Sequence, residues 1–127
     1  MITYLHKGTS VGFLREFHVE ILRGGMNRLL LRSPPMESSP FRVEVHFQFV
    51  QALYLPSMTF SGLHVADCTD DTSALFTDKL VQFPELRIFK VECNSPNSGW
   101  IVAAGCAYDE ALVSAEAPSN FPFMTHN

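Results

Sequence analysis

Alternation of apolar and polar residues predicts β-strand over much of the chain. The clearest case is FRVEVHFQFV, residues 41–50, in which every second residue is apolar: Val43, Val45, Phe47 and Phe49. Successive side chains of a strand point to opposite faces of the sheet. The pattern therefore predicts a strand that buries these four side chains and leaves Glu44 and His46 on a solvated face.

A β-hairpin is predicted nearer the start of the chain. Residues 16–22, EFHVEIL, alternate in the same way, and residues 28–32, RLLLR, form the returning strand. Gly24 and Gly25 lie between them, and glycine readily takes the positive φ of a tight turn. Residues 33–40, SPPMESSP, contain three prolines and are expected to form a loop, because proline cannot donate to a β-ladder.

Short strands continue along the rest of the chain. A second hairpin is predicted from residues 86–93 and 100–108, joined by turn residues at 94–99. The remaining predicted strands and turns are residues 52–55, residues 63–68 and a polar turn at residues 68–73. Residues 1–14 and 74–84 have no clean period, and a short helix is one of the alternatives for residues 74–83.

These elements predict a mainly β fold. Consecutive strands with short turns are antiparallel, and about seven of them close as a sandwich or a strongly bent sheet, with at most one short helix. The length of 127 residues fits a single domain, residues 1–127. Residues 115–127 are polar and proline-containing, so we expect a surface tail there, pinned by Phe121 and Phe123.

Composition and charge narrow the classes of function. Apolar residues make up 46% of the chain, which excludes a disordered protein. The net charge is −4 and the basic residues are scattered, so we expect no nucleic-acid partner. We expect no membrane partner either, because the sequence has no basic amphipathic helix and no apolar run of about 20 residues. The start of the chain does not resemble a secretory leader, and the expected location is the cytoplasm.

The three cysteines do not indicate a disulfide framework or a zinc site. Cys68, Cys93 and Cys106 are widely spaced and none forms a CxxC pair. His64 and Cys68 occur in one predicted strand, but a separation of four residues puts them about 13 Å apart. We therefore interpret all three cysteines as reduced and mostly buried thiols, and we predict no cofactor.

Four polar residues are the candidates for chemistry: His18, Glu20, Glu44 and His46. If their two strands were neighbours, these side chains could ligate a metal or act as an acid/base pair. In a plain meander, however, the RLLLR strand would lie between them and separate them by about 10 Å. We favour a solvated face over a site, and we predict no catalytic residue.

Aromatic residues outside the alternation are candidates for binding a partner. Tyr54 has the opposite parity to Leu53 and Leu55, and Phe89 lies in a segment, LRIFK, whose two faces are both apolar. With Glu44 and His46, these two residues form the predicted binding set. For Phe89 we favour burial in the core over a place on the binding surface.

Part of the chain resembles a known group of proteins. The Phe17-His18 pair, the RLLLR strand and residues 43–55 are similar to small β-rich immunity proteins of bacterial polymorphic toxin systems. The later GWIVAAGCAY strand followed by PSNF is similar in style. This resemblance implies a non-enzymatic domain that binds and masks a toxin.

The expected function is therefore that of a non-catalytic protein-binding domain, immunity-like in that it masks a toxin. A homodimer through an edge strand or apolar face is compatible with this function. Two alternatives stay open. One is a metal-dependent or acid/base enzyme that uses the His/Glu face, and the other is a β domain whose phenylalanine-lined interior holds a small apolar ligand.

Overall fold

The computed structural model describes residues 1–23, 27–72, 85–94 and 98–121, with the backbone alone at residues 21–23 and 71–72. The fold is mainly β, as predicted. Nine strands form one sheet in the order β1-β9-β4-β3-β2-β6-β7-β8-β5, and every neighbouring pair is antiparallel. The strands are β1 (Ile2–Tyr4), β2 (Ser10–Arg23), β3 (Arg28–Ser33), β4 (Arg42–Gln48), β5 (Ala52–Tyr54), β6 (Thr59–Asp67), β7 (Arg87–Glu92), β8 (Ser98–Ala103) and β9 (Gly105–Ala111), with a four-residue helix α1 (Thr69–Thr72).

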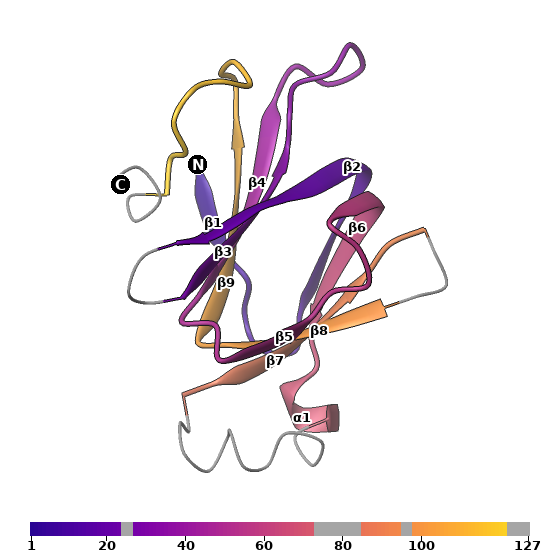
Figure 1. Cartoon of the computed structure of the whole chain (residues 1–127), viewed down its shortest axis with the longest axis vertical. Coiled ribbons are helices and arrows are strands. Elements are labelled where there is room, and N and C mark those ends of the chain that lie inside the picture. Colours follow the sequence, from indigo (N-terminus) through magenta and orange to yellow (C-terminus); the bar gives the residue numbers. More distant parts are fainter. Residues whose placement is uncertain (24–26, 73–84, 95–97, 122–127) are drawn as a thin grey trace.

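The sheet is strongly bent, so that its two halves face each other. Figure 1 shows β5, β7 and β8 running across the direction of β4 and β9. The long strand β2 belongs to both halves, because its first part pairs with β6 and its last part pairs with β3. We call β1, β9, β4 and β3 the first half, and β6, β7, β8 and β5 the second half.

Two chain segments cross together from one half to the other. β4 continues into β5, and β8 continues into β9. At the crossing, Ala104 N donates to Gln48 O at 2.8 Å and Gln51 N donates to Val102 O at 2.8 Å. Phe49 has a φ of 52° at this corner and is only partly buried, so its predicted place on the inner face of the strand is wrong.

The core lies between the two halves. Val43, Val45 and Phe47 are buried there, which confirms the predicted inner face of β4. The ring of Phe47 meets the ring of Phe89 from β7 at a centroid distance of 5.5 Å. This contact joins the halves directly, since β4 belongs to one half and β7 to the other.

The two predicted hairpins are present in the sheet, and one predicted strand is divided into two. Both hairpins are confirmed by the β2–β3 and β7–β8 registers, while Gly24, Gly25 and residues 74–84 lie outside the described residues. The single strand predicted at residues 100–108 is wrong, because the chain changes halves at Ala104 and forms β8 and β9. The expected polar turn after residue 68 contains α1. In the described part of the chain, no helix has the length and apolar character needed to cross a bilayer.

Candidate functional site

Glu44 and His46 are not on a solvated face. Glu44 is 0% exposed and His46 is 1% exposed. Arg42 on the same strand is also 0% exposed. The cover is the segment of residues 117–121, which follows β9 and returns over β4. Within it, Ser119 and Phe121 are themselves buried. The predicted solvated face is therefore wrong, because residues far along the sequence cover it.

The buried charges neutralise one another. Arg32 on β3 faces Glu44 in the register and donates to its Oε2, with Nε at 2.7 Å and Nη2 at 2.6 Å. The other carboxylate oxygen, Oε1, accepts from Ser119 Oγ at 2.8 Å and lies 3.5 Å from Arg42 Nη2. Arg42 in turn donates to the carbonyl oxygens of Ala117 and Pro118. Both oxygens of the buried carboxylate therefore have partners on the protein itself.

The four predicted site residues form two separate pairs, with Arg32 between them. His18 Nε2 lies 2.8 Å from Glu20 Oε1 on β2, and Arg32 Nη1 lies 3.9 Å from the same oxygen. The guanidinium therefore stands between the two predicted pairs, because β3 separates β2 from β4. Among the residues that the structure describes, no three His, Cys, Asp or Glu side chains are grouped so that they could hold a metal.

We call Glu44, Arg32, Arg42 and Ser119 the buried charge cluster. We did not identify Arg32, Arg42 and Ser119 as its members from the sequence. A signal for Arg32 was present, since the predicted hairpin and the next strand carry opposite charges at polar positions. Ser119 gave no signal, because it lies 75 residues from Glu44. The cluster can hold the C-terminal segment on the sheet, and its charges are not open to a substrate.

His46 occupies an apolar place in the same face. Its ring lies 4.8 Å from that of Phe121, and Nε2 has no hydrogen-bonding partner among the described residues. Burial, with a smaller contribution from the positive charge of Arg28, lowers the pKa of His46 from 6.5 to about 4. A neutral, enclosed imidazole is suited to packing rather than to proton transfer at neutral pH.

Of the two predicted aromatic binding residues, one is buried and the other is exposed. Phe89 is fully buried in the core, which confirms the favoured interpretation and removes this residue from the predicted binding set. Tyr54 is 63% exposed and lies on β5, which is an edge strand of the sheet. Its partner in the register is Trp100 on β8. Ala52, Leu53 and Val102 complete a hollow of about 180 Å³ beside this aromatic pair.

A row of side chains continues from Tyr54 across the outer face of the second half. Lys90 follows Trp100 in the register, with its Nζ 5.7 Å from the centroid of the Trp100 ring. Lys90 Nζ lies 4.0 Å from Glu92 Oε2, and Glu92 Oε1 lies 3.8 Å from His64 Nδ1 on β6. We call this row of five side chains the outer row: Tyr54, Trp100, Lys90, Glu92 and His64.

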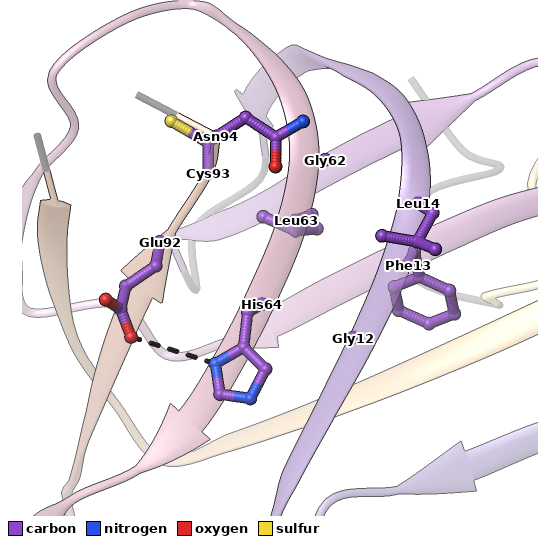
Figure 2. A pocket seen from close by; sticks show the side chains of 9 residues that line it. All are labelled: Gly12, Phe13, Leu14, Gly62, Leu63, His64, Glu92, Cys93 and Asn94. Atoms are coloured by element: carbon purple, nitrogen blue, oxygen red, sulfur yellow. Dashed lines mark ion pairs between the residues drawn. The ribbon is translucent and has the colours of Figure 1, made fainter. Parts of the chain in front are cut away.

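The outer row ends at a second hollow, with a volume of about 190 Å³. Figure 2 shows His64 and Glu92 side by side, with Asn94 and Leu14 around the same space. The hollow exists because two residues of its lining are glycines. Gly12 pairs with His64, and Gly62 lies opposite the bulge that interrupts the β2–β6 register between Phe13 and Glu16.

The cysteines do not provide a nucleophile at these hollows. Cys93 lines the second hollow, but its side chain packs against the main core. Figure 2 shows its sulfur directed away from the imidazole of His64. Burial raises the pKa of the Cys106 thiol, which keeps it protonated.

Comparisons of this chain with protein-family models, with curated proteins and with solved structures found no match. The resemblance to toxin-immunity proteins therefore stays a prediction.

Proposed function

We propose that this chain is a non-catalytic protein-binding domain that engages its partner through strand β5 and the outer row. The observation that carries this proposal is the character of the β5 edge. Tyr54 is 63% exposed there and Leu53 is 40% exposed. An edge strand with large exposed apolar side chains invites pairing with another chain, and proteins usually protect such edges with charge or proline.

The chemistry of the outer row supports this assignment. Tyrosine and tryptophan are the residues that most often anchor protein interfaces, because they bury much area with few rotatable bonds. The hollow beside Tyr54 and Trp100 has the size to accept one apolar side chain of the partner. Lys90 and Glu92 then lie at the border of the aromatic pair, where charged groups favour the correct partner over others.

The acidic balance suggests the kind of partner. With a net charge of −4, the chain attracts basic proteins and repels acidic ones. We propose a basic toxin as the partner, in line with the resemblance to immunity proteins. Masking such a toxin requires only tight binding and no catalytic group.

The test compares Tyr54→Lys with a matched control on the opposite edge of the sheet. Tyr4 on β1 is also an edge tyrosine and is 60% exposed, so Tyr4→Lys makes the same chemical change at a second edge. Each full-length protein is immobilised and presented with a lysate of the source organism. We expect one protein to be retained by the wild type and by Tyr4→Lys. The amount of this protein retained by Tyr54→Lys is expected to be at least tenfold lower.

Two results would contradict the proposal. Equal retention by Tyr54→Lys shows that β5 is not the interface, and equal loss with both variants shows a general effect of added charge. Circular dichroism of each variant establishes that the sheet is intact. Sedimentation of the wild type and of Tyr54→Lys shows whether the retained protein is a second copy of this chain.

A further inference from the structure

The hollow at the end of the outer row has the chemistry of a subsite for one side chain. Its volume of about 190 Å³ is below the roughly 300–1,000 Å³ typical of small-molecule pockets. One wall is apolar, since Leu14 projects from the β2 bulge with 98% of its side chain exposed. The other walls carry the polar groups of Glu92, Asn94 and His64.

The Glu92 carboxylate has acceptor capacity to spare. Its two ion-pair contacts, to His64 Nδ1 at 3.8 Å and to Lys90 Nζ at 4.0 Å, are longer than charge-assisted hydrogen bonds, which are about 2.7–2.9 Å. The side chain is 47% exposed, and no described residue donates a hydrogen bond to it within that distance. A cation entering the hollow can therefore bond the carboxylate without displacing a stronger partner.

The shape of the hollow is fixed by the backbone. Gly62 has a φ of 76°, and a Cβ on it would lie 2.8 Å from Oδ1 of Asn94. A Cβ on Gly12 would lie in ordinary contact with the imidazole of His64, 3.4 Å from its Cδ2, so glycine at this position only widens the space beside the ring. Glu92 and Asn94 are two residues apart at the end of β7, and both line the space between these glycines.

We propose that this hollow is the binding subsite for an arginine side chain of the partner protein. The methylene groups of the arginine lie against Leu14 and the two glycines, and the guanidinium bonds Glu92 and Asn94. Arginine fits better than lysine, because its planar head offers donors in several directions at once. The subsite extends the outer row and so rests on the proposed function, for which it specifies a basic partner.

The test uses small probes, so that it does not require the partner. Nα-acetyl-arginine amide is titrated into the full-length, ¹⁵N-labelled protein at millimolar concentrations, and Nα-acetyl-citrulline amide serves as the uncharged analogue. We expect the arginine probe to move the amide resonances of Gly12, Gly62 and His64. We expect about tenfold weaker binding of the citrulline probe, because it lacks the charge-assisted bond to Glu92.

Two substitutions locate the effect. Glu92→Gln keeps the shape of the side chain and is expected to make the two probes bind alike. Glu37→Gln removes the same charge from an exposed residue of the loop before β4 and is expected to leave the preference unchanged. Equal binding of both probes by the wild type, shifts confined to other residues, or no shift at all would overturn the inference. Such a failure leaves the Tyr54 capture experiment unaffected, so the two proposals are tested separately.

Discussion

Glu44 carries the negative charge that compensates the buried arginines on the face of β4 covered by residues 117–121. Arg32, Arg42 and Ser119 all direct donors or positive charge to its carboxylate. Removing one partner of a buried ion pair leaves the other without compensation in a poorly solvating interior. The same loss at an exposed pair is small, since water replaces the missing partner.

Replacing Glu44 with glutamine is therefore expected to destabilise the protein by about 3–5 kcal/mol, because it leaves the buried guanidinium of Arg42 uncompensated. The control is Glu20→Gln, whose carboxylate is 39% exposed and is 3.9 Å from Arg32. This control should change stability by less than about 1 kcal/mol. Urea unfolding measures both values, and equal losses would show that Glu44 is not the centre of the cluster.

His46 makes the stability depend on pH in a defined window. Its pKa in the folded protein is about 4, below its ordinary value of 6.5. Between these values the unfolded chain binds more protons than the folded chain, so stability falls as the pH decreases from 6.5 toward 4. Above pH 6.5 the imidazole is neutral in both the folded and the unfolded chain, so His46 costs no stability there. Below pH 4 the loss of folding free energy due to His46 reaches about 3 kcal/mol.

The measurement is urea unfolding of the wild type and of His46→Gln at pH 7 and pH 5. Glutamine does not titrate, so the variant should lose less stability between these two pH values. Identical losses in both proteins would mean that other groups account for the pH dependence.

At the scale of elements, the attachment of β5 to β8 depends on a close approach of two backbones. Gly99 on β8 lies so near to β5 that a Cβ would come within 2.3 Å of the carbonyl oxygen of Tyr54. A contact that short can be relieved only by moving one strand away from the other. The edge that we assign to partner binding therefore requires glycine at this position.

We predict that Gly99→Ala detaches β5, destabilises the protein by about 1–3 kcal/mol and weakens partner retention. Hydrogen exchange of the β5 amides should accelerate, because their bonds to β8 open more often. Gly105→Ala is the control, since the nearest atom to its Cβ would be Gln48 Nε2 at 4.0 Å. Unchanged exchange at β5 in Gly99→Ala would contradict the close approach.

The elements that could be predicted from the sequence are those set by local alternation. The inner face of β4 followed from the parity of Val43, Val45 and Phe47, since burial between two sheet halves selects that pattern. Its outer face could not be predicted, because the cover comes from residues 117–121 and polar side chains are also expected on a solvated face. The exposure of Tyr54 followed from its parity, whereas the hollow at Gly12 and Gly62 depends on strand pairing that local patterns do not specify.

The whole molecule is joined by segments that cross between its halves. β2 belongs to both, and the β4–β5 and β8–β9 connections cross side by side. The sequence predicted the bent antiparallel sheet in outline. It did not predict the change of halves at Ala104, because this residue interrupts a continuous apolar run without a proline or a polar turn.

Because of these crossings, we expect the two halves to unfold in a single transition. Trp100 is the only tryptophan and lies in the second half, so its fluorescence reports on that half. Far-ultraviolet circular dichroism reports on all strands. Coincident urea midpoints are expected from the two signals, and an earlier midpoint for fluorescence would show that the second half unfolds independently.

The cover over β4 also has a consequence for the order of events during synthesis. Arg42 leaves the ribosome 75 residues before Ala117, whose carbonyl oxygen accepts one of its hydrogen bonds. At roughly 5–20 residues per second, that interval lasts several seconds. During this time the growing chain carries an uncovered row of charges and the bare imidazole of His46. The speed of translation between these two residues therefore sets how long this face stays uncovered.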